Sequence, residues 1–320
     1  MPTRGFSLSA GVLTVTALTV LLLVPLPLHR LGTRLAHANY TAFAQGLDTV
    51  SDRCTVGSLA RAAQRIVARR ARHAATISAF GGRTVRDAHA SAWSPIVAGI
   101  EFRTVTFTAG TGEAMRLLQV RVNPTVASLR IHGTGAAADV PALARRANAI
   151  AAINASYFDA NRQPLGYLKI NGRVRNGSIA TGAAFTGVFT MTGNVPQIVS
   201  RERFNPTAVD TALQAGPRLV AHGAPTKGLR ETRSFRQTGV AVTNDGHIVM
   251  YATDGSYRGA TWAEMQSLLT GPSRAGGIDP SDVLNLDGGS SSQIYVRQGA
   301  QTITTGFPTL LPVIIAAHAR

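Results

Sequence analysis

The spacing of apolar residues predicts β-strands through most of the chain. Residues 100–108 and 117–122 alternate apolar and polar side chains, a pattern typical of a strand with one face in the core. Residues 240–242 and 248–251 flank the turn sequence Asn244-Asp245-Gly246, which favours a β-hairpin. Mainly apolar runs predict further strands, at residues 149–153, 185–192, 283–284 and 293–296. Residues 164–172 are predicted to form a turn, a strand and a second turn.

Two segments carry the signals of short helices. Pro141 lies in the first turn of a predicted helix over residues 140–147. Thr261 and Glu264 match a capping box that begins a second helix, predicted to continue to Leu269. Many strands and few helices predict an α+β fold, with a mixed, largely antiparallel sheet, a few packing helices and a site at strand ends.

The first 95 residues differ from the rest of the chain. Arg4 precedes an apolar run over residues 11–28, and Ala36-His37-Ala38 has the form of a cleavage site. Residues 1–38 are therefore expected to be a signal peptide or an N-terminal anchor, and the protein to be exported, periplasmic or secreted. Residues 39–95 are expected to be an Arg-rich helical extension or linker, ahead of a main domain over 96–320.

The charge of the chain narrows the range of partners. The formal net charge is +16, and arginine supplies nearly all of it because Lys169 and Lys227 are the only lysines. No zinc-finger spacing or RNA-binding aromatic motif accompanies this charge, so nucleic acid is not expected as a partner. An anionic glycan, a sugar phosphate, or a membrane contacted through residues 1–38 and the basic extension explains the charge equally well.

The segment Asn285-Leu286-Asp287-Gly288-Gly289-Ser290 carries the strongest chemical signal. It lies between two predicted strands, which would hold a carboxylate rigidly at the turn. Its glycines allow positive φ angles and the close approach of a ligand, and its serine offers a hydroxyl and a backbone N–H group to an anion. An Asp-Gly turn without chemistry would use the same residue types, and this segment alone does not decide between the two.

Polar groups also occur at four other predicted strand ends. Asn154 follows the strand over 149–153, Arg218 follows Gly216-Pro217, Arg236 precedes Thr238, and Asp254 precedes Gly255. Each has a structural alternative. Asn154 would satisfy strand-end backbone groups, either arginine would form an ion pair, and Asp254 would sit in an Asp-Gly turn.

Taken in order along roughly residues 96–318, these segments resemble the phosphodiester glycosidase family. The resemblance rests on seven motifs, Asn-x-x-Tyr-Phe (154–158), Pro-x-Gly (164–166), Gly-Pro-Arg-Leu-Val (216–220), Arg-x-Thr-Gly (236–239), Asp-Gly (254–255), Gly-x-Thr (259–261) and Asn-Leu-Asp-Gly-Gly-Ser-Ser (285–291). Two positions depart from it. The family often reads Arg-Thr-Ala-hydrophobic-Gly where this chain has Arg236-Gln237-Thr238-Gly239, and Gly where it has Ala155. These departures bear on the substrate more than on the fold.

The resemblance implies an exported hydrolase that cleaves the glycosidic bond of a sugar-1-phosphodiester, releasing free sugar and a phosphomonoester. A phosphomonoester has a second pKa of about 6 and leaves without the protonated carboxylic acid that ordinary glycosidases supply. Asp287 is accordingly expected to be the base, nucleophile or electrostatic stabiliser at the anomeric carbon. Arg236 is expected to hold the phosphate, and Asp254 is the second carboxylate if the reaction needs one.

The remaining site residues are expected to bind substrate. Arg218 would hold the phosphate together with Arg236, because its planar guanidinium matches two phosphate oxygens. Asn154 and Asn285 would bind sugar hydroxyls or orient the carboxylate. The backbone wall nearest to the ligand is expected to consist of Gly288, Gly289 and Ser290.

Other functional classes have less support in the sequence. The Gly-x-Ser-x-Gly elbow of serine hydrolases and the Gly-x-x-x-x-Gly-Lys loop of nucleotide-binding proteins are both missing from it. A non-catalytic glycan- or envelope-polymer-binding module on the same fold is the main alternative. No cofactor is predicted from the histidine spacing. Asp287, Asp254 and Asn285 are nevertheless suitable oxygen ligands for a hard divalent cation, which leaves metal dependence open.

Overall fold

The computed structural model describes residues 85–320 except 230–233 and 256–258. The expected export segment and residues 39–84 of the expected extension lie outside the described residues. The end of that extension, by contrast, belongs to the folded domain, because residues 86–90 form a strand that pairs with residues 105–108. The sheet therefore begins before residue 96. No helix in the described part of the chain is long and apolar enough to cross a bilayer.

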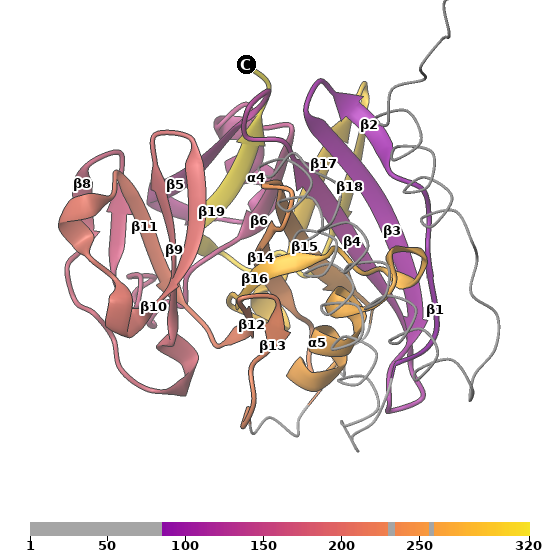
Figure 1. Cartoon of the computed structure of the whole chain (residues 1–320). Helices are drawn as coiled ribbons and strands as arrows, with labels where there is room; N and C mark the ends of the chain where they lie inside the picture. Colours follow the sequence, from indigo (N-terminus) through magenta and orange to yellow (C-terminus); the bar gives the residue numbers. More distant parts are fainter. Residues whose placement is uncertain (1–84, 230–233, 256–258) are drawn as a thin grey trace, which may run out of the picture. The chain divides into compact units, whose positions relative to one another are not determined.

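Nine strands form the largest sheet, in the order β1-β3-β4-β15-β14-β16-β12-β13 with β2 beside β3 (Figure 1). They are β1 (Arg86–Ala90), β2 (Ser94–Val97), β3 (Ile100–Thr108), β4 (Ala114–Val122), β12 (Arg218–Ala221), β13 (Ala224–Pro225), β14 (Thr238–Thr243), β15 (Ile248–Asp254) and β16 (Pro280–Asn285). The β14–β15 hairpin has the predicted turn, with Val242 opposite Ile248.

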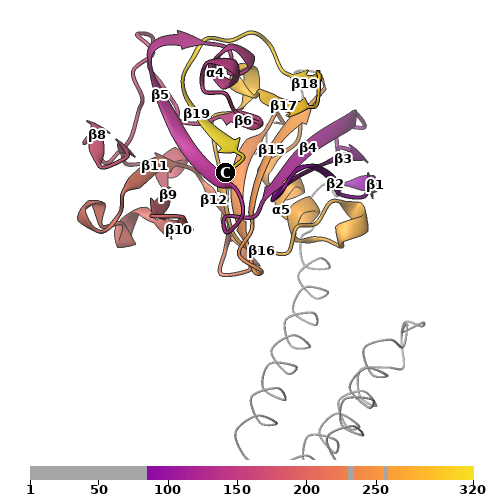
Figure 2. The ribbon, with the colours of Figure 1, turned by 90° about the horizontal axis from the view of Figure 1, so that it is seen from above.

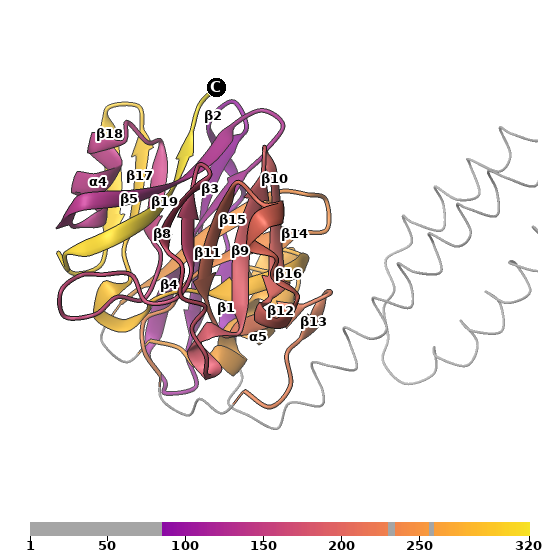
Figure 3. The same cartoon turned by 90° about the vertical axis from the view of Figure 1, so that its left-hand side faces the viewer.

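Two five-stranded sheets complete the domain. One has the order β10-β9-β11-β7-β8 and lies nearest the viewer in Figure 3. Its strands are β7 (Leu168–Ile170), β8 (Arg173–Asn176), β9 (Gly187–Thr192), β10 (Val195–Ser200) and β11 (Thr211–Ala215). The other has the order β18-β17-β6-β19-β5. Its strands are β5 (Ser128–Ala138), β6 (Ala151–Asn154), β17 (Ile294–Gln298), β18 (Gln301–Thr305) and β19 (Leu311–His318).

Short helices connect and cover these sheets. Helix α4 (Val140–Arg146) begins at Asp139, whose carboxylate accepts a hydrogen bond from the Ala142 N–H. Helix α5 (Trp262–Thr270) begins with the predicted capping box, in which Thr261 and Glu264 bond each other's backbone N–H. The short 3-10 helices are η1 (Ala183–Phe185), η2 (Arg201–Arg203), η3 (Pro206–Ala208), η4 (Ser273–Ala275) and η5 (Gly289–Ser291).

One core is shared by all three sheets, whose strands surround a common interior when seen from above (Figure 2). Met250 of the first sheet, Phe189 of the second and Ile315 of the third are buried together in it. The opposite face of the first sheet packs against α5 through Met265. Full burial of each such side chain contributes about 1.5–3 kcal/mol, so this shared core holds the three sheets together.

The structure confirms the predicted α+β class, and it shows three sheets where a single mixed sheet was expected. Every pair of adjacent described strands is antiparallel. The division into three sheets follows from the order in which the chain connects the strands, and the alternation of apolar and polar residues does not reveal that order. β16 belongs to the first sheet, and β17, only nine residues further on, belongs to the third.

Candidate functional site

The loop between β16 and β17 carries Asp287 and crosses from the first sheet to the third. On the first-sheet side, the Leu286 N–H donates to the Thr238 carbonyl at 2.9 Å, and the Gly289 N–H donates to the Arg236 carbonyl at 2.8 Å. On the third-sheet side, the Asp287 N–H donates to the Ala155 carbonyl at 3.2 Å. The Asp287 turn is therefore held by backbone hydrogen bonds from two sheets.

Asn154, at the end of β6, locks this loop with its side chain. The side chain is 1% exposed, and its Nδ2 donates to the Asp287 backbone carbonyl at 2.7 Å. Its Oδ1 accepts from Thr238 Oγ1 and from the Gln293 N–H, both at 3.0 Å. Both ends of the amide are thus used within the protein, which makes Asn154 a positioning residue for Asp287.

The Asp287 carboxyl group is half-buried. Burial raises its pKa from 3.8 to about 6, because a desolvated carboxylate is disfavoured relative to the neutral acid. Hydrogen bonds from the Ser291 side chain and the Gly288 backbone oppose this rise. Asp287 is consequently mostly ionised at pH 7 and remains close enough to its pKa to exchange a proton readily.

Asn285 and Tyr157 form a polar pair beside Asp287. Asn285 Nδ2 donates to the Gly216 carbonyl at 3.1 Å and to the Tyr157 hydroxyl at 3.3 Å, and that hydroxyl donates to the same carbonyl at 2.7 Å. Burial and the nearby Asp287 charge raise the pKa of Tyr157, so it stays a neutral phenol. Asn285 Oδ1 is buried and has no hydrogen-bond partner in the described part of the chain.

Tyr157 was not among the predicted site residues. Tyr157 belongs to the Asn-x-x-Tyr-Phe motif, which is the feature of the sequence that could have identified it. Its hydrogen bond with Asn285 joins residues that are 128 positions apart, and the motif alone could not reveal that contact.

Arg236 lies against the loop that carries Asp287. The residue is 2% exposed, its Nε donates to the Gly289 carbonyl at 3.0 Å, and its guanidinium lies 4.2 Å from the centre of the Phe307 ring. A Cβ on Gly288 would come within 2.7 Å of the Arg236 carbonyl oxygen, so only glycine allows this approach. Gly289 has φ +61°, a left-handed conformation that also favours glycine.

Ser290 lies at the outer surface of the same loop. Ser290 is exposed, and its backbone carbonyl accepts a hydrogen bond from Thr309 Oγ1 at 2.7 Å. The neighbouring Ser291 is buried, and it is this serine whose side chain bonds the Asp287 carboxylate. Ser291, which was not among the predicted site residues, is therefore the serine whose side chain contacts the carboxylate. The expected part of Ser290 in the backbone wall beside the ligand stays a prediction.

Arg218 and Asp254 each form an ion pair elsewhere. Arg218 Nη2 binds Asp282 Oδ1 at 2.6 Å, with both side chains largely buried. The Asp254 carboxylate binds the guanidinium of Arg116 on the adjacent strand β4. Among the described residues, no hydrogen bond or ion pair links either residue to the Asp287 loop.

The site therefore brings Asn154, Asn285, Asp287, Arg236 and the two glycines together. Within residues 85–320, gaps aside, there is no cluster of three or more His, Cys, Asp or Glu side chains able to hold a metal ion. The assembled chemistry is one carboxylate with a raised pKa, a buried guanidinium hydrogen-bonded to the loop that carries this carboxylate, and the amide and phenol groups of Asn285 and Tyr157.

Comparison with known proteins gives one family and several related folds. The family model described as phosphodiester glycosidase matches residues 147–310. A search of curated protein sequences gives no match.

Three solved structures share the fold. The catalytic domain of zebrafish N-acetylglucosamine-1-phosphodiester alpha-N-acetylglucosaminidase, auto-inhibited by its pro-peptide, is 16% identical with a TM-score of 0.55, over 76% of this chain and 91% of that one. A hypothetical protein from Synechocystis is 16% identical with a TM-score of 0.51, over 70% of this chain and 63% of that one. A putative exported protein from Burkholderia pseudomallei is 11% identical with a TM-score of 0.51, over 75% of this chain and 98% of that one.

Proposed function

Because the chain belongs to the phosphodiester glycosidase family, we propose that it is an exported hydrolase that cleaves the glycosidic bond of a sugar-1-phosphodiester. Water adds across the bond between C1 and the phosphate oxygen, giving a free sugar and a phosphomonoester. The observation that carries this proposal is the Asp287 carboxyl, half-buried with a pKa of about 6 on a loop fixed from two sheets. The name of the zebrafish relative, a glycosidase of this bond type, supports the same reaction class.

One carboxylate suffices for this reaction. The departing phosphomonoester has a second pKa of about 6, so it leaves without a proton from a second acid. The ionised Asp287 then stabilises the developing positive charge at C1, either by attacking it or by taking a proton from the incoming water. Asp254, bound to Arg116, is not required in this scheme and is assigned a structural role.

The negative charge of the phosphate is balanced by Arg236, which lies against the loop that carries Asp287. Arg236 places a buried guanidinium against Gly289, where it both fixes the turn and makes the local potential positive. Arg218 is assigned to its ion pair with Asp282, so Arg236 alone takes the phosphate role that the sequence divided between two arginines. Asn285, whose buried Oδ1 has no partner in the described residues, is assigned to a hydroxyl of the sugar.

A product assay tests the proposal. The protein is incubated with methyl phosphodiesters of several sugar 1-phosphates, beginning with α-N-acetylglucosamine, and the products are separated by chromatography. We expect free sugar and methyl phosphate. A matched Asp287→Asn variant with an unchanged circular dichroism spectrum should lose about 10³-fold or more in kcat, because the carboxylate acts in the transition state.

The control is Asp210→Asn, which alters an aspartate whose carboxylate bonds the Gly193 N–H at the far end of the second sheet. It should retain activity. Release of sugar 1-phosphate in place of free sugar would contradict the proposal. Equal sugar binding by the parent and Asp287→Asn proteins, with no turnover by either, would identify a non-catalytic glycan-binding module.

A further inference from the structure

A second cavity lies at the opposite end of the strands that carry the Asp287 site. Its volume is about 220 Å³, and its lining includes Trp93, Arg121, Asp245, Ser273 and Asp279. Asp245 occupies the β14–β15 turn and Asp279 immediately precedes β16, whereas Thr238 and Asn285, at the other ends of β14 and β16, border the Asp287 loop. The two sites are thus separated by the full length of these strands.

One wall of this cavity is fixed by a buried cation. Arg103 is 3% exposed, and its guanidinium donates to Gln119 Oε1 at 2.6 Å, to the Gly277 carbonyl at 2.9 Å, and to both the carbonyl and the hydroxyl of Ser273 at 3.2 Å. Gln119 Nε2 in turn donates to the Gly276 carbonyl at 3.0 Å. The loop over residues 273–277 is consequently rigid before any ligand arrives, which lowers the entropic cost of binding.

The same loop has no room for a larger residue at Gly277. A Cβ there would overlap the Gly271 carbonyl oxygen. Burying a guanidinium without a carboxylate partner is costly, and among the described ion pairs none includes Arg103. The hydrogen bonds that Arg103 donates offset this cost, and together with Gly277 they give the cavity a wall of fixed shape.

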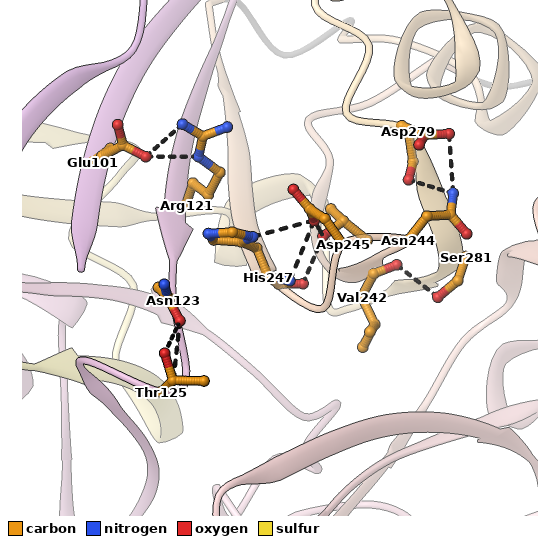
Figure 4. Close-up of polar contacts among 11 residues, drawn as sticks. Glu101, Arg121, Asn123, Thr125, Val242, Asn244, Asp245, His247, Asp279 and Ser281 are labelled. Carbon is orange, nitrogen blue, oxygen red and sulfur yellow. Dashed lines mark hydrogen bonds and ion pairs between the residues drawn. The ribbon is translucent and has the colours of Figure 1, made fainter. Parts of the chain in front are cut away.

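The polar side chains around the cavity are held in place by neighbours (Figure 4). Arg121 binds Glu101 through Nε at 2.7 Å, and Asp279 Oδ1 accepts from Asn244 Nδ2 at 2.9 Å. Asp245 Oδ1 lies 3.1 Å from His247 Nδ1, and the Asp245 side chain is 64% exposed. Asp245 Oδ2 takes part in none of its described contacts.

Trp93 supplies the apolar surface of the cavity. The guanidinium carbons of Arg103 and Arg121 lie 4.2 and 4.5 Å from the centre of its ring. Arg103 and Arg121 therefore already make cation–π interactions with the Trp93 ring, which disfavours the binding of a cationic ligand there. An aromatic ring bordered by carboxylates, a guanidinium and a hydroxyl suits a ligand with one apolar face and several hydroxyl groups.

We propose that this cavity is a second, non-catalytic carbohydrate site that takes one neutral pyranose ring. Its volume lies below the 300–1,000 Å³ typical of pockets for drug-sized ligands, as expected for a single sugar ring. The sugar contacts the half-buried Trp93 side chain where it lines the cavity, and its hydroxyls donate to Asp245 and Asp279 and accept from Arg121. The charge of these protein groups strengthens the hydrogen bonds. Such a site would hold one sugar of a larger glycan while another part occupies the Asp287 loop.

Tryptophan fluorescence tests this proposal without relying on catalysis. The chain has two tryptophans, so Trp262→Phe leaves Trp93 as the single reporter. The variant is titrated with methyl glucopyranoside, methyl galactopyranoside and methyl N-acetylglucosaminide. We expect a saturable change with at least one of them. Adding Asp245→Ala or the conservative Asp279→Asn should weaken binding about tenfold, the equivalent of one lost charge-assisted hydrogen bond.

Two controls separate this site from the proposed active site. Asp287→Asn should leave the Trp93 response unchanged, and Asp210→Ala should do the same for an acidic side chain outside the cavity. The proposal is overturned if no sugar changes the fluorescence, or if Asp245→Ala and Asp279→Asn, still folded by circular dichroism, bind as well as the parent. A response to calcium chloride but to no sugar would also overturn it and reassign the cavity to a cation.

Discussion

The raised pKa of Asp287 predicts that the proposed catalytic carboxylate destabilises the fold at neutral pH. Its pKa moves from 3.8 to about 6, mainly through burial, a shift of about two units. At about 1.4 kcal/mol per unit, ionising this group in the folded protein costs about 3 kcal/mol more than ionising it in the unfolded chain. Hydrogen bonds from Ser291 and Gly288 are already included in that balance.

The sign of the pH dependence follows from proton binding. Between pH 4 and pH 6 the folded protein binds more protons at Asp287 than the unfolded chain does, so the contribution of this group to stability falls as the pH rises through that window. Below pH 4 both states are protonated and no penalty remains. Above pH 6 both are ionised and the full cost of about 3 kcal/mol applies.

Asp287→Asn removes the titration while keeping an acceptor oxygen for Ser291 and Gly288. We expect the variant to be about 3 kcal/mol more stable than the parent at pH 8, with the difference disappearing near pH 3. Urea denaturation at half-unit pH steps, analysed by linear extrapolation, measures it. A variant that is equally or less stable at pH 8, or a difference that does not change with pH, would refute the reasoning.

Four further predictions concern the scaffold and the reaction. Asn154→Ala should lower the free energy of unfolding by about 3 kcal/mol and reduce kcat, since it leaves the buried Gln293 N–H and Thr238 hydroxyl without their acceptor; urea unfolding and steady-state kinetics measure both. Arg103→Met should cost about 3 kcal/mol or more, because the carbonyls of Ser273 and Gly277 lose their donor, and Arg103→Lys should recover part of that loss in the same unfolding assay. Gly239→Ala should lower the melting temperature markedly in calorimetry, because the new methyl overlaps the Tyr251 hydroxyl in the core and lies 2.9 Å from the Leu284 carbonyl oxygen. In the parent protein kcat/KM should rise with pH through an apparent pKa of about 6, the value for Asp287, and a flat profile from pH 5 to 8 would count against a role for its carboxylate.

Local features of the fold were predictable from the sequence. The strand over 100–108, the hairpin turn at 244–246 and the capping box at Thr261 depend on neighbouring residues, and the structure has all three. The division into three sheets depends on pairings between distant segments, which alternation does not specify. β1 lies in a polar run within the expected extension, and the structure shows it mostly exposed at the sheet edge. Such a strand has no apolar face by which its sequence could be recognised.

In the candidate site, too, features set by neighbouring residues were predictable, whereas contacts between segments far apart in the sequence were not. Asp287 and its glycines stand out because a strand running into Asn-Leu-Asp-Gly-Gly is unusual in itself. Arg218 forms an ion pair with Asp282, which is 64 residues away in the sequence, and Asp254 pairs with Arg116, which is 138 residues away. No local motif reveals that these partners lie close in space. The sequence identified the residue types at strand ends, and the sheet register decided which of them meet.

The most direct test of the proposed reaction is to hydrolyse a sugar-1-phosphodiester in water enriched in oxygen-18 and to follow the label by mass spectrometry. Cleavage of the bond between C1 and oxygen places the label in the free sugar and leaves the phosphomonoester unlabelled. This is the predicted result, and Asp287→Asn should abolish it. Label in the phosphate would show attack at phosphorus and would contradict the assignment of Asp287 to the anomeric carbon.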